Sequence, residues 1–482
     1  MEYFLSILLF FPIIGIVGLS FVQDGVKFYS FSIAFLELAG ALALYFFYDT
    51  NIGGMQFIEK IPLIKEYGVS YYIGVDGISL LLVLITTFST LIVLALLEED
   101  FNKNSVALLF FLESVFLGIF LSLDAVLFYI FWELMLIPLF FSLQDWESKI
   151  KVAMFIIYFL ISSLLLLFSF GMVAYIFHQE SSQWSFSILH WYALIIPEPL
   201  NTLLFIVMVV ALFLKVPLFP FLSWLKIAFE KSSPAGALLL TTLMVVVAFY
   251  ATIRVAFPIF AHAIENLVST MVFFAVIIAS YAFFALLQVA NLKEFIFYKS
   301  FYYIALIILY LFSLEKPFFE LAFLLVFFYV LLLIVDLYLL ELYLKREESN
   351  KKLAKAVAKS MPKYSFLLII NTLFYFLLPL FLVYEFIGFN DENLTNILLI
   401  AFSGFFSFLF LLAVLKFFAQ NFFAKKEKVR VRDMSTREFL VTLFFIVSLT
   451  FASFYSKNSF LSVKKSSVAL IDFIYKKANR GN

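Results

Sequence analysis

The feature that most constrains this chain is a succession of long apolar runs. Each run is close to the roughly 20 residues that an α-helix needs to cross a bilayer. Only α-helices and closed barrels satisfy all their backbone hydrogen bonds inside lipid. We therefore predict an all-α polytopic membrane protein with about 14 transmembrane helices, near residues 3–22, 28–48, 78–98, 105–123, 125–143, 152–177, 200–228, 235–257, 265–290, 298–314, 319–344, 364–389, 394–419 and 438–456.

The composition agrees with a membrane protein and excludes several classes of site. Hydrophobic residues make up 65% of the chain and charged residues 14%. Cysteine is absent, which excludes disulfides and iron–sulfur ligation by this chain. The sequence has no glycine-rich dinucleotide motif and no paired-histidine haem arrangement. We therefore expect no cofactor in this chain, and its net charge of zero indicates no nucleic-acid partner.

The basic residues predict the orientation of the chain. Lys and Arg concentrate in the loops that follow odd-numbered runs, above all at 345–363 and 425–432. The positive-inside rule then places these loops in the cytoplasm and both termini outside. We expect a multi-pass protein of the cell inner (cytoplasmic) membrane. The two clusters are interpreted as solvated loops that set the topology, with contact to a partner or to anionic lipid as the alternative.

One lysine lies deep inside an apolar run. Lys215 occurs in LFLKVPLFPFLSWL, shortly before Pro217 and Pro220. A charged group inside the membrane is costly, so it indicates a functional site. Prolines interrupt a helix, and an interrupted helix at membrane depth is tolerated only where it is buried in protein or lines a polar cavity. Together these features predict ion or proton translocation.

A carboxylate of opposite charge lies in another run. Glu133 is near the middle of FYIFWELMLIPLFF. A nearby carboxylate stabilises the ammonium form of a buried lysine, whereas burial favours the neutral amine. Moving or neutralising Glu133 would therefore release a proton from Lys215. Four other charged residues inside runs are interpreted as structural ion pairs or as groups that reach an interface, and they are Glu37, Arg254, Asp336 and Glu341. Glu113 and Glu385 are kept as candidate proton sites.

Two similar short segments indicate an internal duplication. KVPLF at 215–219 is similar to LLPLF at 377–381, and Glu385 follows the second segment in the same run. Paired interrupted helices at corresponding positions are typical of inverted-repeat transporters. A chance match in a chain rich in Leu and Phe is the alternative.

Five segments together resemble one family. The resemblance is to the antiporter-like M subunit of bacterial complex I (NADH:quinone oxidoreductase), the mitochondrial chain 4 type. The segments that carry it are IGVDGISLLLVLITTF (73–88), FWELMLIP (131–138), LKVPLFPF (214–221), YEF (384–386) and DMSTREFL (433–440).

The resemblance implies a fold and a division of the chain. It implies fourteen helices, with two inverted five-helix repeats in which helices 7 and 12 are broken. The corresponding domains are the N-terminal spans 1–98, repeat one at 99–257, repeat two at 258–422, and the last span with the tail at 423–482.

The resemblance also implies a function. The chain would be a proton-translocating subunit of the membrane arm, beside other antiporter-like subunits, and proton translocation would use Glu133, Lys215 and Glu385. NADH, FMN, the iron–sulfur clusters and quinone would belong to the rest of the assembly.

The sequence departs from the family pattern in its centre. Val246 stands where the family has a second lysine, and Tyr303 and Phe327 stand where it has histidines. Candidate relay residues are therefore Glu113, Lys299 and Tyr303, although Lys299 is also interpreted as an interfacial lysine. The alternatives are a subunit of a multisubunit cation/proton antiporter or membrane-bound hydrogenase, and a non-pumping scaffold subunit of complex I.

Overall fold

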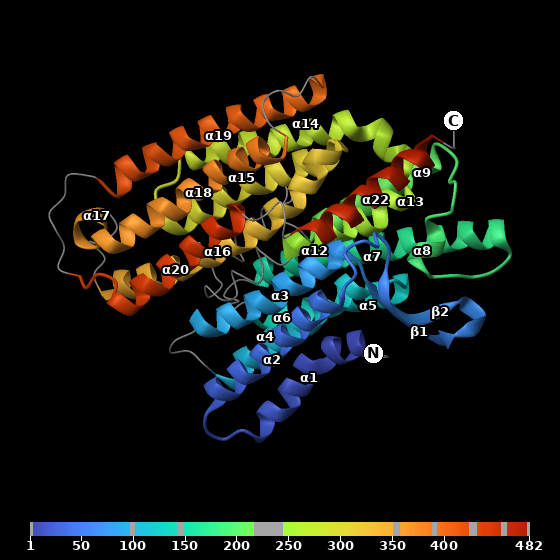
Figure 1. The fold of residues 1–482 in the computed structure, drawn as a ribbon, viewed down its shortest axis with the longest axis horizontal. Helices are drawn as coiled ribbons and strands as arrows, with labels where there is room; N and C mark the ends of the chain where they lie inside the picture. The colour runs from blue at the N-terminus through green and yellow to red at the C-terminus, as the bar shows by residue number, and fades with distance from the viewer. Residues whose placement is uncertain are drawn as a thin grey trace. The chain divides into compact units, whose positions relative to one another are not determined.

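The computed structural model describes residues 3–96, 102–142, 149–215, 244–349, 357–387, 393–423, 431–454 and 460–479. Most of these residues are helical, as the apolar runs predict (Figure 1). The chain divides into two compact units. Unit 1 comprises Met1–Leu267 and Leu461–Asn482, and unit 2 comprises Val268–Phe460.

Unit 1 is a helical bundle with one β-hairpin. Within it α4 packs against α1 and α3, and α7 packs against α9 (Figure 1). Its helices are α1 (Phe4–Phe21), α2 (Val26–Phe47), α3 (Gly77–Leu96), α4 (Lys103–Leu121), α5 (Ala125–Leu134), α6 (Leu136–Ser142), α7 (Lys149–Ser181), α8 (Ile188–Trp191), α9 (Leu200–Leu214), α12 (Met244–Ala251), the π-helix η3 (Thr252–Ala256), α13 (Phe257–Ile259) and α22 (Leu461–Ala478).

The hairpin lies between α2 and α3 and was not predicted. Strands β1 (Gln56–Ile64) and β2 (Val69–Val75) pair antiparallel, joined by the short helix η1 (Lys65–Tyr67). Gly68 completes the turn with a φ of 66°, which glycine adopts without strain. The amide of Leu123 donates to the Tyr72 carbonyl at 2.8 Å, so the hairpin is attached to the junction of α4 and α5.

Unit 2 is organised around one fully buried helix. The apolar window of α15 (Leu292–Phe312) is 100% buried, and this helix packs against α16 (Lys316–Ser349) and α19 (Leu394–Asn421). Helix α18 (Pro362–Phe386) packs against α16, α19 and α20 (Thr436–Phe454). The remaining elements are α17 (Val357–Ser360) and α14 (Ala261–Leu286), a helix in which the boundary between the units falls.

The described residues contain 11 helices that are long and apolar enough to cross a membrane. Three shorter apolar helices cover Ala125–Pro138, Leu200–Leu214 and Met244–Ile259. Every run predicted from the sequence overlaps one of these helices, and the exact number of fourteen spans stays a prediction.

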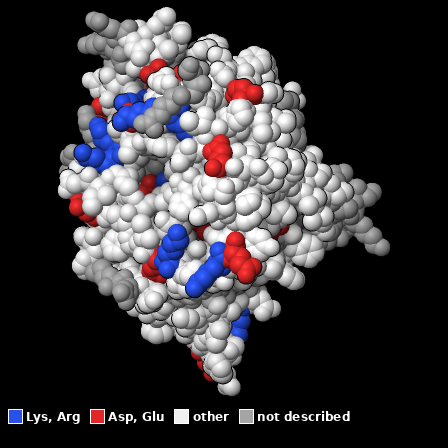
Figure 2. Space-filling model, turned by 90° about the vertical axis from the view of Figure 1, so that its right-hand side faces the viewer, with Lys and Arg blue, Asp and Glu red and all other residues white. Residues whose placement is uncertain are grey.

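Large apolar side chains on the outside of the helices fit a lipid environment. Phe21 and Phe28 are each 81% exposed, on α1 and α2. On the face drawn in Figure 2, charged side chains are few and most of the surface is uncharged. Exposed apolar area of this kind is unfavourable in water and favourable against acyl chains.

The structure corrects the predicted break in the twelfth span. Helix α18 is one helix with Pro379 inside it. Proline removes one backbone hydrogen bond, but neighbouring helices allow a membrane helix to continue through that position. The predicted break after Lys215, at Pro217 and Pro220, lies outside the described residues.

Candidate functional site

Lys215 and Glu133 form an ion pair inside unit 1. Lys215 directly follows α9, and its Nζ lies 3.3 Å from Oε1 of Glu133 on α5. The ammonium also donates to the backbone carbonyl of Trp132 at 3.2 Å. The lysine side chain is 1% exposed and the glutamate side chain 32%. The structure thus joins two residues that the sequence singled out separately.

The local sequence explains how Glu133 is positioned. Asp124 caps α5, because its carboxylate accepts from the amides of Val126 at 2.9 Å and Leu127 at 3.3 Å. The helix ends directly after Glu133, at Leu134, and α6 starts at Leu136. Pro138 lacks the amide that would bond to the Leu134 carbonyl in a continuous helix, which accounts for this interruption.

Two aromatic rings complete the surroundings of the Lys215 ammonium. Its Nζ lies 4.8 Å from the ring centroid of Trp132 and 5.2 Å from that of Phe159 on α7. Aromatic faces attract a cation, most strongly where water is excluded. The ammonium is therefore held by one partly exposed carboxylate, one carbonyl and two rings.

A second ion pair lies inside unit 2. Nζ of Lys299 on α15 lies 2.8 Å from Oδ1 and 2.7 Å from Oδ2 of Asp336 on α16, and both side chains are 0% exposed. Two residues of α18 complete the group, since Asn371 donates to Oδ1 of Asp336 at 2.7 Å and Thr372 accepts from Lys299 at 3.3 Å. The interfacial interpretation of Lys299 was therefore wrong, and sequence reasoning missed Asp336 as its partner.

The remaining candidate residues lie on four different helices. Glu385 is half-buried near the end of α18. Tyr303 is buried on α15, and its hydroxyl has no hydrogen-bond partner among the described residues. Glu113 is buried on α4 and interacts with Thr90 on α3. Glu37 is buried on α2, and its carboxylate has no hydrogen-bond partner in the described part of the chain.

The VDGIS segment has a structural role in unit 1. Asp76 caps α3 by accepting from the Ser79 amide at 2.9 Å, and its other oxygen pairs with Arg254 of the π-helix η3. The structural ion pair expected for Arg254 is thus present. A Cβ at position 77 would collide with the carbonyl of Ser462 on α22, so a glycine is required there.

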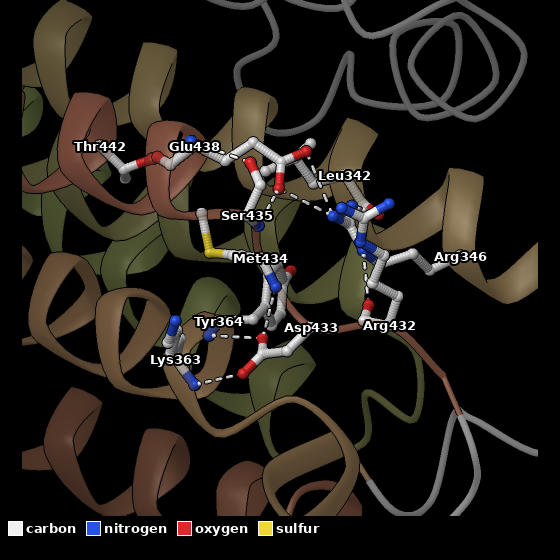
Figure 3. A network of polar contacts seen from close by, with 10 residues as sticks. All are labelled: Leu342, Arg346, Lys363, Tyr364, Arg432, Asp433, Met434, Ser435, Glu438 and Thr442. Atoms are coloured by element: carbon white, nitrogen blue, oxygen red, sulfur yellow. Dashed lines mark hydrogen bonds and ion pairs between the residues drawn. The ribbon is translucent and has the colours of Figure 1, made fainter.

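The DMSTREFL segment connects three helices of unit 2 (Figure 3). Asp433 caps α18 from outside that helix, because its carboxylate accepts from the amides of Lys363 at 2.9 Å and Tyr364 at 3.4 Å. Ser435 and Glu438 then form a capping box at the start of α20, with reciprocal hydrogen bonds of 2.6 and 3.2 Å.

Arg346 adds the third helix to this network. It lies near the end of α16 and donates from one nitrogen to both carboxylate oxygens of Glu438, at 3.2 and 2.9 Å (Figure 3). Its Nε donates to the Arg432 carbonyl at 3.0 Å. The segment therefore connects the ends of α16, α18 and α20, and two of these helices, α16 and α18, also carry Asp336, Asn371 and Thr372.

The chemistry available at these pairs is proton exchange between an amine and a carboxylate. Among the described residues, no group of three or more His, Asp or Glu side chains is placed to hold a metal ion. In unit 1 the amine belongs to Lys215 and the carboxylate to Glu133, and in unit 2 they belong to Lys299 and Asp336.

Comparison with known proteins identifies the family. The sequence model of the NADH:quinone oxidoreductase/Mrp antiporter transmembrane family matches residues 122–418, which is more than half of the chain. The chain belongs to this family. The matched residues include Glu133, Lys215, Lys299 and Asp336.

Similar proteins carry related names. The NADH-quinone oxidoreductase subunit M of Rickettsia conorii is 26% identical over 274 residues, which is 56% of this chain and 55% of that protein. The NADH-ubiquinone oxidoreductase chain 4 of Marchantia polymorpha is 30% identical over 275 residues, covering 56% and 54%. In these matches the chain spans about half the length of the relatives.

The fold is found in a solved respiratory complex. A chain of respiratory complex I from Thermus thermophilus, in a structure with bound NADH, matches with a TM-score of 0.77 and 19% identity. The match covers 98% of this chain and 99% of that chain. The likeness shows that the two chains share one fold over nearly their whole length.

Proposed function

We propose that this chain is a proton-translocating subunit of the membrane arm of NADH:quinone oxidoreductase. The single observation that carries the proposal is the buried ion pair between Lys215 and Glu133. A lysine with 1% exposure inside an apolar bundle is costly, and membrane proteins retain such groups at ion and proton pathways. Family membership and the subunit M and chain 4 names of the relatives support the assignment to complex I.

The geometry suggests how Lys215 and Glu133 bind and release a proton. While Glu133 is ionised and close, it stabilises the ammonium of Lys215. When Glu133 is protonated or moves away, the ammonium keeps, among the described residues, the Trp132 carbonyl and the two aromatic rings. The low-dielectric surroundings then favour the neutral amine, and the proton leaves Nζ for a neighbouring water. Glu385 on α18 is the proposed terminal site of the path.

The proposal places the redox chemistry in other subunits. NADH oxidation and quinone reduction, with FMN and iron–sulfur clusters, would take place elsewhere in the complex. This chain would lie beside other antiporter-like subunits and would contribute proton movement alone. Its two inverted repeats are proposed at 99–257 and 258–422.

We place the chain in the cell inner membrane, with the loops 345–363 and 425–432 on the cytoplasmic side. Reporter fusions in these two loops test the orientation. We expect a cytoplasmic signal from both, and an external signal from both would contradict the fourteen-span arrangement.

A second candidate function comes from the family itself. The matching family includes Mrp antiporters, so the same pair would serve a cation/proton antiporter subunit. Proton movement driven by a sodium gradient, without NADH, would favour this candidate. Proton movement that depends on NADH oxidation would favour complex I.

The test removes each member of the pair. We expect Glu133→Gln and Lys215→Ala to abolish most proton pumping in sealed vesicles, while the complex still assembles. Oxidation of NADH with an artificial acceptor should not change, because the proposal assigns the redox groups to other subunits. A matched control is Lys345→Ala, which breaks a partly exposed ion pair with Glu341 one turn away on α16. Wild-type pumping in both site variants would remove the pair from the mechanism.

A further inference from the structure

Unit 2 holds a closed group of ionisable and polar side chains on three helices. Lys299 and Asp336 are wholly buried, and α18 supplies Asn371 and Thr372 around them. Asn371 also donates to the Leu332 carbonyl of α16 at 3.1 Å, which fixes its amide. The described residues of this unit thus contain an acid and a base in direct contact, with no exposure of either.

We propose that Lys299 and Asp336 form a second proton-exchange site, in which Lys299 is the base and Asp336 the acid. The inference rests on the proposed function, since it assumes that the chain moves protons. It assigns to unit 2 a site that is built from α15, α16 and α18.

Stability alone does not account for this pair. Moving two charges into a low-dielectric interior carries a desolvation penalty that their mutual attraction often fails to offset. Replacing a buried ion pair by well-packed hydrophobic residues of similar volume is frequently neutral or stabilising. An ionisable pair inside a membrane bundle therefore points to a role that needs the ionisable groups themselves.

The distances allow a balanced proton transfer. Nζ of Lys299 lies 2.7 Å from Oδ2 of Asp336, which is within hydrogen-bond range. Breaking one N–H bond of the ammonium and forming one O–H bond on Asp336 gives a neutral amine and a neutral carboxylic acid. The step changes no net charge, and it removes the charge separation that the low-dielectric surroundings disfavour. Asp336 then passes the proton to water, and Lys299 accepts another.

The partners on α18 suit both protonation states. Asn371 donates to Oδ1 of Asp336, an oxygen that accepts whether or not Oδ2 carries a proton. The Thr372 hydroxyl accepts from the ammonium and has a proton to donate to a neutral amine. The group therefore keeps its hydrogen bonds while the proton moves, which lowers the reorganisation that the transfer requires.

A buried hydroxyl indicates where water reaches the pair. The Lys299 Nζ lies 4.3 Å from the ring centroid of Tyr375, and that ring lies 5.5 Å from the ring of Tyr303. Both tyrosines are 0% exposed. The Tyr375 hydroxyl interacts with Asp336, and the Tyr303 hydroxyl has no hydrogen-bond partner among the described residues. Buried hydroxyls are nearly always satisfied by protein or by ordered water. We infer water at the Tyr303 hydroxyl, which would connect the pair to a proton path.

The first test replaces Lys299 by a residue that keeps the positive charge but does not release its proton. Arginine preserves a cation beside Asp336, yet it does not deprotonate in proteins. We expect the Lys299→Arg variant to assemble and to lose at least half of the protons pumped per NADH oxidised in sealed vesicles. Wild-type pumping in an assembled Lys299→Arg variant would overturn the proposal.

A double variant distinguishes proton exchange from a structural role. It also tests the proposal if the Lys299→Arg variant does not assemble. Lys299→Met with Asp336→Asn replaces the pair by uncharged residues of similar volume. We expect assembly at the wild-type level with a similar loss of pumping. Wild-type pumping, or failure to assemble, would show a structural pair and overturn the proposal. The matched control is Lys345→Met with Glu341→Gln on the same helix α16, which should pump normally.

Lys215→Ala in the same preparation distinguishes this inference from the proposed function. If Lys215→Ala loses pumping while the Lys299 variants keep it, only the second site is wrong. If Lys215→Ala also pumps normally, the proposed function of the chain is wrong as well.

Discussion

Each of the two units contains a lysine buried in an apolar bundle, but the carboxylate partners of the two lysines differ in distance and exposure. In unit 1 the carboxylate partner of Lys215 lies 3.3 Å away, and a third of its side chain is exposed. In unit 2 Asp336 contacts Lys299 through both oxygens, at 2.7 and 2.8 Å, and neither side chain is exposed. The first pair is loose and open, and the second is closed.

The difference follows from the elements that hold each pair. Glu133 lies at the end of α5, just before the interruption at Met135, and α9 ends directly before Lys215. Lys299 and Asp336 lie inside the long helices α15 and α16, and α18 adds two polar side chains. The first pair therefore lies at helix ends and the second inside helices. An open pair suits exchange with an outside partner, and a closed pair suits transfer within the protein.

The largest expected difference between the pairs is in stability. Asp336→Ala leaves a wholly buried ammonium without its carboxylate, and we expect it to lose about 3–5 kcal/mol of unfolding free energy. Glu133→Ala removes a partly exposed group, and Lys215 keeps the Trp132 carbonyl and two aromatic rings. Its loss should be clearly smaller.

Thermal denaturation of the purified complex, followed through the amount of this chain that stays assembled, measures both variants. Adding Lys299→Met to Asp336→Ala is the control, because removing the uncompensated charge should restore part of the loss. Equal losses for Asp336→Ala and Glu133→Ala would remove the distinction between a closed and an open pair.

Much of this arrangement could be predicted from the sequence. Lipid permits few backbone structures, so the apolar runs alone predict the helices. Lys215 and Glu133 stand out because a charge in an apolar run is unfavourable, and their opposite signs suggest a pair. These inferences need only local sequence and the physics of the bilayer.

The rest depends on contacts between distant residues. Lys299 and Asp336 are 37 positions apart in the chain, and nothing local shows that α15 is central to its unit. The hairpin was missed although Gly68 marks a turn, because its strands lie between two stronger helical patterns. Helix α22 was missed because it is amphipathic rather than apolar, and its contacts with α3 and α13 are tertiary.

A smaller effect is expected from the residue that caps α18. Asp433→Ala leaves the amides of Lys363 and Tyr364 without their acceptor, which should lower stability by about 1–2 kcal/mol. Because α18 carries Asn371 and Thr372, the change should also loosen the closed pair and leave the open pair unaffected. Hydrogen exchange of α18 amides is the measurement, with Asp433→Asn as a control that keeps one acceptor. Faster exchange in α5 instead of α18 would contradict this.

The smallest expected effect is a pH dependence at the cap of α5, in unit 1. Burial raises the pKa of Asp124 to about 6, and its ordinary value is 3.8. The folded state therefore binds a proton more readily than the unfolded state between these values, and the contribution of Asp124 to stability falls as pH rises through about 4 to 6.

Comparing wild type with Asp124→Asn at pH 5 and pH 7 measures this contribution. Since one pKa unit corresponds to about 1.4 kcal/mol, we expect the wild type to lose about 1 kcal/mol relative to the variant over this interval. A difference that does not change with pH, or that changes in the opposite direction, would show that Asp124 stays ionised throughout.

The most direct test of proton translocation by this chain is pumping by the Lys215→Arg variant. Arginine keeps a cation beside Glu133 and the aromatic rings but does not release its proton. Protons pumped per NADH oxidised would be measured in sealed vesicles that contain equal amounts of assembled complex. We predict normal assembly with most of the pumping lost. Pumping at the wild-type level in that variant would contradict a translocating role for the buried lysine.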